Sequence, residues 1–456
     1  MRLQHIQFKN INQFKNLSID LSDSTSSAMT VILGEQDSGK TSILKNIFHI
    51  LSWFSGRYKD LRTAGIVIAD NDMYDDSLYA SIQVEVSYPK ELGTLLEDAG
   101  AQPDIDGLCQ WQLIKTKSTA LGIGLSRPET AQLEKLVTRY QKQSIQDPLF
   151  SIPCIAYYPV ERFVHEANIQ NKNAATNLGS LHHAYDLTSL SFTMFSKFFD
   201  WYREVYDLEN AQTAQLLKQY LDPDQRFQGY DQMNELFAGL EQAYRLSPQR
   251  CLNSLNSAIH MVLPEMGELF IEFQPRLRLM INFNGQKIPF MQLSQSYRIW
   301  VALVGDLVRR ACLLNPQSLY PCMETDGIVL IDEVDALLDQ AHRHSILTRL
   351  QRAFPRMQFI VSALNSDIVE QNNEVACYQL LDQQLFKLDF AEHQQKLQSI
   401  YQGLEIETQI ESLPQETTHS ETGPALSSLE DIISLAEQLN ENERAQLLEH
   451  VKKITP

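Results

Sequence analysis

The chain has 456 residues, of which 43% are hydrophobic and 21% are charged. This balance is ordinary for a globular protein, and the length allows about two or three domains. The formal net charge is −19, from 38 basic and 57 acidic residues, which argues against sequence-independent binding to nucleic acid or membranes as the main activity. No apolar run approaches about 18 residues, and residues 1–10 lack the apolar core of a signal peptide. We therefore expect a cytoplasmic protein.

The hydrophobic pattern predicts a chain of mixed strands and helices. Alternating or continuous short apolar runs predict strands, at residues 2–10, 16–22, 28–33, 80–88, 152–160, 267–274, 277–283, 327–331 and 357–364. A period of about 3.6 residues predicts helices, at residues 42–54, 181–263, 297–314 and 340–354. Residues 89–148 are mixed and polar and receive no assignment.

The composition changes near residue 395. Residues 396–426 are rich in Gln, Glu, Ser and Thr and poor in apolar residues, which predicts a flexible linker. Ser428 then stands three residues before Asp431 as a capping box. Apolar side chains recur on one helical face over 428–439 and again over 440–454. Two short amphipathic helices are therefore predicted, and each is too short to be stable alone in water.

The strongest motif is GEQDSGKT, residues 34–41, which meets the pattern GxxxxGK(S/T) between a predicted strand and a predicted helix. Loop amides and the helix N-terminus present positive partial charge to phosphate groups. Lys40 would add a charge at the β and γ phosphates of a nucleotide, and Thr41 would bind Mg²⁺. The predicted nucleotide-binding residues of this P-loop are Gly34, Gln36, Asp37, Ser38, Gly39, Lys40, Thr41 and Ser42.

A second motif is GIVLIDE, in which the apolar strand 327–331 ends at Asp332 and Glu333. Ligands bind at the carboxyl ends of strands in open parallel sheets. Asp332 can hold Mg²⁺ through water, and Glu333 can polarise an attacking water. Two acids after a strand are often only a helix cap, but their combination with Lys40 favours a catalytic role for Glu333 and a metal role for Asp332.

A third segment, QLSQSYRIW at residues 292–300, opens a long predicted helix before the acidic strand. A serine before a helix is common as an N-cap, so the order of the motifs matters more than this segment alone. That order resembles the ABC-type ATPases of the SMC, Rad50, RecF and overcoming-lysogenization-defect group. The resemblance implies an α/β fold: an ABC-type P-loop ATPase head with a helical insertion and a flexible C-terminal tail.

The same resemblance implies ATP and Mg²⁺ as cofactors and a homo-oligomer built from head-to-tail dimers. In that family, the signature segment of one subunit closes on the γ-phosphate bound by the other. Carried over to this chain, the resemblance implies that Ser294 is the signature serine, Arg298 the signature arginine and Asp335 the D-loop acid. These three residues would complete the nucleotide-binding set.

A narrower resemblance covers residues 155–164, 182–210 and 293–316, which look like the ATPases of bacterial anti-phage operons, notably the PtuA-like ATPases of Septu systems. It implies that Arg162 lies near the nucleotide. It also implies an HNH nuclease as a separate partner and contact with DNA only through that partner. The aromatic residues between Phe195 and Tyr202 predict a packed helical arm rather than a platform for stacking bases.

Composition and resemblance together divide the chain into an N-terminal ATPase lobe with the P-loop (1–165), a helical insertion (166–265), a lobe with the signature segment and acidic strand (266–395), a linker (396–426) and a helical partner-binding tail (427–456).

Three departures from the family pattern bear on mechanism. Gln36 and Asp37 replace an asparagine and a glycine of the loop, and Ser296 replaces the signature glycine. Leu364 stands where a switch histidine is expected. Leucine can neither hydrogen-bond the γ-phosphate nor orient Glu333 and its water, and the loss of one such group typically costs about 10²–10³ in rate. We therefore expect a slow ATPase that uses ATP as a clamp or switch.

No second catalytic centre is predicted. The histidines show neither HNH nor HExxH spacing, and the pair His342 and His344 predicts a solvent-facing helix side. Six cysteines occur without a CxxC pair, which predicts free thiols rather than disulfides or a zinc site. Three functions stay open: an ATP-binding scaffold and sensor of an anti-phage complex, a RecF- or Rad50-like DNA repair ATPase, and a degenerate ATPase in which ATP is a structural ligand.

Overall fold

The computed structural model describes residues 1–22, 28–75, 77–93, 95, 107–117, 124–164, 181–185, 195–221, 249–336, 338–369 and 375–388. All of them belong to one compact unit, Met1–Glu392. The linker predicted at 396–426 and the tail predicted at 427–456 lie outside the described residues, and the internal lobe boundaries stay predictions.

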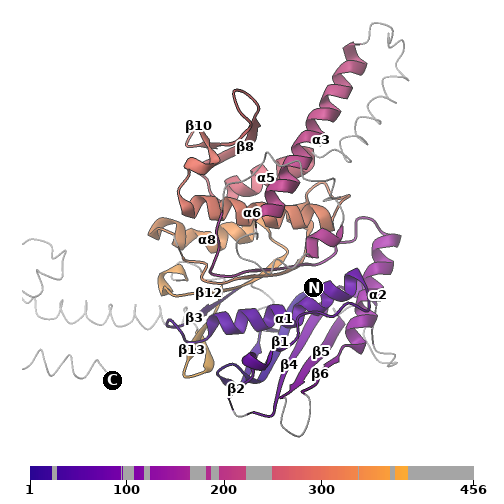
Figure 1. Ribbon diagram of the computed structural model, residues 1–456, viewed down its shortest axis with the longest axis vertical. Helices are drawn as coiled ribbons and strands as arrows, with labels where there is room; N and C mark the ends of the chain where they lie inside the picture. The colour runs from indigo at the N-terminus through magenta and orange to yellow at the C-terminus, as the bar shows by residue number, and fades with distance from the viewer. Residues whose placement is uncertain are drawn as a thin grey trace, which may run out of the picture. The chain divides into compact units, whose positions relative to one another are not determined.

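A six-stranded sheet forms the centre of this unit, in the order β14-β13-β3-β12-β11-β7 (Figure 1). Five neighbouring strands are parallel, and only the edge strand β14 is antiparallel. The bounds are β3 Met29–Leu33, β7 Cys154–Tyr158, β11 Gly327–Ile331, β12 Met357–Ala363, β13 Ala376–Leu381 and β14 Gln384–Leu388. Every residue of β3, β11 and β12 is buried, because helices cover both faces of a parallel sheet.

A second, antiparallel sheet has the order β2-β1-β4-β5-β6. Its strands are β1 Arg2–Ile11, β2 Phe14–Asp20, β4 Tyr79–Tyr88, β5 Gly107–Thr116 and β6 Ser126–Glu129. Buried and exposed positions alternate along β2 and β5, as in a sheet with one solvated face. Trp111 of β5 is buried and donates its indole hydrogen bond to Ile50 O at 3.1 Å, which ties this sheet to the first helix.

Helices cover the central sheet on both faces. Figure 1 shows α1 between the two large sheets and α5, α6 and α8 on the opposite face of the central sheet. The helices are α1 Lys40–Lys59, α2 Ala131–Gln146, α3 Ser196–Leu221, α5 Gln249–Val262, α6 Gln295–Leu314, α7 Pro321–Glu324 and α8 Gln340–Ala353. A small antiparallel sheet joins β8 Met266–Glu272, β9 Arg278–Phe283 and β10 Gln286–Pro289. Short 3₁₀ turns are η2 Asp70–Asp72, η3 Lys90–Leu92, η4 Leu181–Tyr185, η6 Phe290–Gln292 and η7 Ser366–Ile368.

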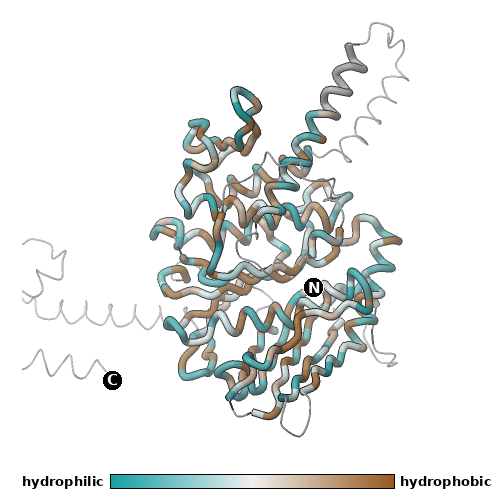
Figure 2. The backbone as a smooth tube through the Cα atoms, viewed as in Figure 1, coloured by the Kyte–Doolittle hydropathy of each residue, from teal (hydrophilic) through white to brown (hydrophobic). Residues whose placement is uncertain are grey.

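The core runs continuously through these layers, as the hydrophobic segments of the inner strands and helices in Figure 2 show. The predicted aromatic arm is part of it: Phe198 is fully buried, and Gly305 of α6 makes room for it, since a Cβ there would lie 2.4 Å from the Phe198 ring. Tyr202 donates a hydrogen bond to Leu269 O at 2.8 Å. The packed-arm prediction is therefore confirmed. All six cysteines are buried free thiols. Among the described residues, no helix is both long and apolar enough to span a bilayer.

The sequence prediction missed β5, β6 and α2, which fill most of the unassigned stretch 89–148, and also β10, β13 and β14. The strand pattern of β5 was hard to detect because its outer face carries Gln110 and Gln112, and its buried face ends at Lys115. The helix α2 is polar except for one buried stripe. Short amphipathic elements of this kind give a weak periodic signal, since only three or four positions of each face the core.

A buried ionic cluster fastens α6 to the central sheet. Asp306 accepts hydrogen bonds from Arg309 Nε at 2.9 Å, Arg310 Nε at 2.7 Å and Tyr158 Oη at 2.9 Å. Burial alone would raise the pKa of Asp306, but the guanidinium groups of Arg310 and Arg309 lower it to about 2. The arginines also donate to the carbonyls of His183 and Ala184 in η4. The helix that carries the signature segment is thus held rigidly on β7 and η4.

Candidate functional site

The P-loop connects β3 to α1 and holds its lysine in a fixed place. Lys40 is only 5% exposed, and its Nζ donates hydrogen bonds to Gly34 O at 2.7 Å and Glu35 O at 2.6 Å. Burial lowers the pKa of Lys40, while the nearby carboxylates Glu333, Asp332 and Asp335 oppose that shift. The ammonium group therefore lies inside the loop and in the field of the acids that follow β11.

Two unusual backbone conformations shape this loop. Gly39 has φ 106°, and a Cβ there would lie 2.0 Å from Gln13 Nε2. Gln13 in turn donates to Ser38 O at 2.8 Å, so only glycine fits beside it. Asp37 has φ 61°, the left-handed region that aspartate tolerates better than most residues. The aspartate that replaces the family glycine is thus compatible with a glycine-like backbone.

The remaining loop residues are open to ligands. Gln36, Asp37 and Thr41 are exposed, whereas Ser38 and Ser42 are partly buried. Among the described residues, Ser38 Oγ is a buried hydroxyl without a hydrogen-bond partner. The loop therefore lies at the start of a 20-residue helix, where the helix dipole favours anions.

The two acids after β11 are held by a serine of β12. Asp332 is fully buried, and its Oδ1 accepts a hydrogen bond from Ser362 Oγ at 2.5 Å. The same Ser362 Oγ accepts from Glu333 N at 2.7 Å, and Ser362 O accepts from Val334 N at 2.9 Å. Ser362 therefore fixes the turn on which both acids stand. The sequence analysis missed this residue; its one signal is that it is the serine in the otherwise apolar end of β12.

Arg162 holds the same turn from the other side. Its Nη1 donates to Asp332 O at 2.6 Å and its Nη2 to Glu333 O at 2.9 Å, and the residue is 5% exposed. Burial lowers the pKa of Arg162 to about 10, and the nearby carboxylates limit the shift. The structure thus places Arg162 behind the two acids, against their main chain, and its predicted proximity to the nucleotide stays a prediction.

The surroundings of Glu333 disfavour its ionised form. Burial raises its pKa, and the negative charges of Asp332 and Asp335 raise it further, against the pull of Lys40 and Arg162. Its backbone has φ 42°, a left-handed conformation that is costly for a residue with a long side chain. Such a carboxylate is a better proton acceptor than an ordinary surface glutamate.

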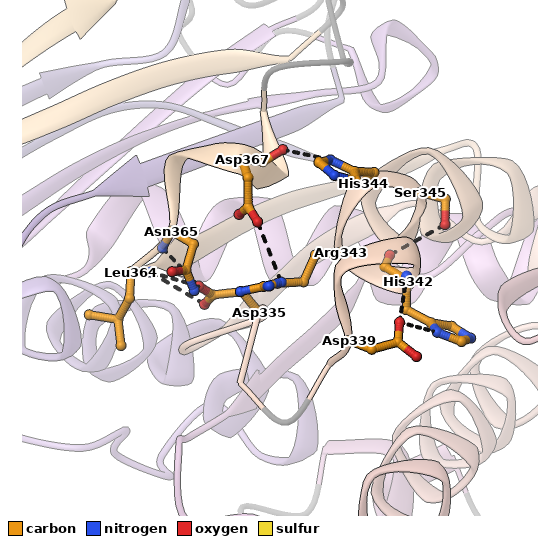
Figure 3. Close-up of polar contacts among 9 residues, drawn as sticks. All are labelled: Asp335, Asp339, His342, Arg343, His344, Ser345, Leu364, Asn365 and Asp367. Atoms are coloured by element: carbon orange, nitrogen blue, oxygen red, sulfur yellow. Dashed lines mark hydrogen bonds and ion pairs between the residues drawn. The ribbon is translucent and has the colours of Figure 1, made fainter. Parts of the chain in front are cut away.

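Asp335 binds the loop after β12, as Figure 3 shows. Its carboxylate accepts hydrogen bonds from Leu364 N at 3.1 Å, Asn365 N at 2.9 Å and Asn365 Nδ2 at 2.7 Å. Leu364 is 42% exposed, and its side chain points away from Asp335. The position at which the family resemblance predicts a switch histidine therefore presents an apolar side chain, while its backbone is held by Asp335.

The signature segment lies at the start of α6. Ser294 caps this helix by accepting a hydrogen bond from Tyr297 N at 3.4 Å, and its side chain is exposed. Arg298 is half-buried, and its Nε has no hydrogen-bond partner among the described residues. No hydrogen bond or ion pair found in the described part of the chain joins Ser294 or Arg298 to the P-loop. The structure therefore does not bring the signature segment to the lysine within one chain.

His342 and His344, predicted to face solvent, are half-buried. The His342 side chain is 12% exposed and lies against Asp339 and Glu265, and His344 Nδ1 lies 3.0 Å from Asp367 O. Helical periodicity could not show this, because Glu265, before β8, and Asp367, in the loop after β12, are distant from α8 in the sequence.

The donor set suits a hard divalent cation. Among the described residues, Asp332 Oδ2 is buried and has no hydrogen-bond partner, while Thr41 offers an exposed hydroxyl at the start of α1. Oxygen ligands of this kind are those that Mg²⁺ prefers, and it keeps several waters besides them. Thr41 and Asp332 would hold such an ion.

The fold and the site together define an ABC-type P-loop ATPase. Residues 5–259, more than half of the chain, match the AAA domain family, and the chain belongs to that family. It is 26% identical over 416 residues to the retron Ec83 probable ATPase of Escherichia coli, which covers 85% of this chain and 73% of that protein. It is also 26% identical over 388 residues to the retron Vc95 probable ATPase of Vibrio cholerae serotype O1 biovar El Tor, covering 79% and 70%.

Further similarities are more limited. A stretch of 73 residues is 36% identical to the Septu protein PtuA of Bacillus mycoides strain KBAB4, covering 16% of this chain and 10% of that protein. Among solved structures, the Smc head bound to the C-winged helix domain of ScpA superposes with a TM-score of 0.46 and 12% identity, covering 86% of this chain and 100% of that one. The SMC head domain from Thermotoga maritima gives 0.38 and 14%, covering 85% and 98%.

The raised pKa of Glu333 predicts a stability effect of Glu333→Gln. Because the pKa is higher in the folded chain than in the unfolded chain, ionisation costs stability as the pH rises through these pKa values. We expect Glu333→Gln to raise the Tm on the order of 1–2 °C near about pH 7.5, and the gain to vanish toward about pH 4. Calorimetry at both pH values checks this, with Glu268→Gln on β8 as the control for losing one charge. A gain that is equal at both pH values would contradict the assignment.

Proposed function

We propose that this protein is a slow Mg²⁺-dependent ATPase that uses ATP as a switch between separate and paired subunits. One observation carries the proposal: the P-loop lysine lies in the field of three carboxylates, and Oδ2 of Asp332 is buried without a hydrogen-bond partner in the part of the chain that the structure describes. In this arrangement, Lys40 and the loop amides bind the phosphates. Thr41 and Asp332 hold the ion, and the ion, when bound, offsets the charge of the β and γ phosphates.

Glu333 acts as the general base toward an attacking water in this proposal. Its raised pKa makes it a stronger acceptor, and Ser362 and Arg162 fix the backbone that carries it. The water itself has no polar partner from the switch position, because Leu364 is apolar there. Since positioning of the water is then incomplete, we infer slow turnover and a long-lived ATP-bound state.

In this proposal, a second copy of the chain completes the ATP site. Ser294 at the exposed start of α6 can contact the γ-phosphate held by a second subunit, and the half-buried Arg298 follows it one turn along the helix. In a head-to-tail dimer, these groups would lie at the γ-phosphate of the second subunit, and Asp335 would face the dimer interface. Ser296 in place of glycine adds a side chain where the signature segment would approach the phosphate most closely. This favours a weaker, regulated dimer interface over one that is always closed.

We infer that the biological setting is anti-phage defence. The chain is similar over most of its length to two retron probable ATPases and over a short stretch to the Septu protein PtuA. We propose that it scaffolds and controls a separate HNH-type nuclease, which contacts DNA in its place. The strongly acidic chain suits a subunit that does not itself bind nucleic acid, unlike a repair ATPase that acts on DNA ends.

Nucleotide binding is tested at Lys40. Lys40→Ala removes a charged donor to the phosphates, and a hydrogen bond to a charged group is worth enough that ATP affinity should fall about 10- to 100-fold. Titration calorimetry measures this, and Lys45→Ala, one turn further along α1, is the matched control. ATP affinity that is the same in wild type and Lys40→Ala would overturn the site.

Turnover is tested at Leu364. Wild type should hydrolyse ATP well below about 1 s⁻¹, and Leu364→His should speed turnover by up to about 10²-fold by restoring a polar group beside the water. Leu381→His, at another exposed leucine, is the matched control, and Glu333→Gln should abolish any gain. Turnover that stays absent in Leu364→His while ATP still binds would identify ATP as a structural ligand only.

Partner binding is tested at the C-terminus. We propose that residues 428–456, with their two amphipathic patterns, dock in a groove of the nuclease. Deletion of these residues should leave ATP binding intact and release the partner in co-purification of the expressed operon. Retention of the partner at full stoichiometry would show that another surface binds it.

A further inference from the structure

The turn between β1 and β2 contacts the P-loop directly. Gln13 on this turn donates from its Nε2 to Ser38 O at 2.8 Å, and the same nitrogen lies against Gly39, where a Cβ would be only 2.0 Å away. That Cβ would also lie 2.8 Å from Cζ of the buried Phe14. Two consecutive residues of the antiparallel sheet therefore pack on the loop immediately before Lys40.

The contact with Gln13 fixes the direction in which the Ser38–Gly39 peptide group faces. This peptide is trans, so it is planar and its C=O and N–H point in opposite directions. Since Ser38 O points toward Gln13, the N–H of Gly39 points away from it. Within the described parts of the chain, no hydrogen bond from this N–H is found. It is therefore an unused donor in the segment whose amides bind phosphate groups in a P-loop.

The same turn also holds the chain on the other side of Lys40. Asn46 of α1 is 1% exposed, and its Nδ2 donates both to Asn12 Oδ1 at 2.8 Å and to Ser42 O at 2.8 Å. Gln13 thus binds the loop before Lys40, and Asn12 binds the helix turn after it. The phosphate-binding segment lies between two points that the antiparallel sheet fixes.

The turn is itself held by the chain around η2. Asn10 and Asn12 have φ 54° and 47°, left-handed conformations that asparagine adopts more easily than most residues. Asn12 N donates to Asp72 O at 2.7 Å, and Tyr74 N donates to Asn10 O at 2.9 Å. Backbone hydrogen bonds therefore keep the turn in place before any ligand arrives.

We propose that Gln13 is a positioning residue for phosphate binding, because it holds the Ser38–Gly39 peptide with its N–H free for a phosphate oxygen. This inference rests on the proposed binding of ATP at the P-loop. Gln13 gives its donor to a loop carbonyl, so it acts through the peptide group rather than by touching the nucleotide.

Loss of this donor changes what the loop presents to an anion. Glycine permits rotation of the preceding peptide group because it has no Cβ. Once released, the peptide can turn Ser38 O toward the phosphates in place of the Gly39 N–H, and a carbonyl oxygen repels an anion. Binding must then restore the peptide orientation as well, which lowers the affinity.

The alternative is that Gln13 only stabilises the fold. A purely structural contact changes the Tm of the free protein and leaves the nucleotide affinity of the folded protein unchanged. A positioning contact weakens ATP and ADP by a similar factor, because loop amides bind phosphates that both nucleotides carry. The two roles are therefore distinguished by measuring both affinities.

The experiment compares two half-buried glutamines of the same sheet. Gln13→Met keeps the length of the side chain and removes its donor. Gln7→Met is the matched control, since Gln7 Nε2 also donates one hydrogen bond, but to Asn16 Oδ1 on β2 at 3.3 Å. Titration calorimetry measures the binding of Mg-ATP and of ADP. We expect Gln13→Met to weaken both about 3- to 10-fold, the range for one hydrogen bond, and Gln7→Met to change neither by more than about twofold.

The outcomes separate this inference from the proposed function. Equal affinities in wild type and Gln13→Met, with Lys40→Ala still weakening ATP binding, overturn the positioning role alone. An equal loss in Gln7→Met, or a loss for ATP without one for ADP, also overturns it. ATP binding that is absent in wild type, or unaffected by Lys40→Ala, overturns the nucleotide site and this inference with it. Thermal melts without nucleotide check folding, and Gln13→Ala replaces Gln13→Met if that variant does not fold.

Discussion

Mutual repulsion among the carboxylates after β11 is the constraint on which the rest of the site depends, because neighbouring groups must offset it. Asp332, Glu333 and Asp335 stand within four residues. Asp332 and Asp335 are buried and Glu333 is half-buried, and like charges interact strongly where water is excluded. Ser362 gives a hydrogen to one of them, and Arg162 binds the carbonyls between them. These partners hold the backbone turn on which the acids stand. With them, the negative field is kept and is directed toward the P-loop lysine.

The parallel sheet brings these groups together. The strands β3, β11 and β12 are neighbours, so the P-loop, the acids and the switch loop all leave the same edge. That geometry follows from the topology alone and needs no contact between the three loops. The signature segment, in contrast, begins a helix that the Asp306 cluster fastens to the other side of the sheet.

The sequence predicted what local pattern specifies. The P-loop and the acidic strand were recognisable because a short motif between a strand and a helix carries its own context, and most inner strands read as apolar runs. Contacts between residues that are far apart in the sequence were not recognisable. Ser362 looked like any polar residue at a strand end, and His342 looked like a surface histidine, since their partners are up to tens of residues away. β5 was missed because half of its side chains are polar.

The resting place of Lys40 leaves one of its donors for a ligand. Its ammonium already donates two short hydrogen bonds to carbonyls of the loop, and an ammonium carries three N–H groups. The loop backbone thus holds the charge in place before a phosphate arrives. The conformational entropy of ordering this long side chain is therefore lost on folding rather than on binding, which favours ligand affinity.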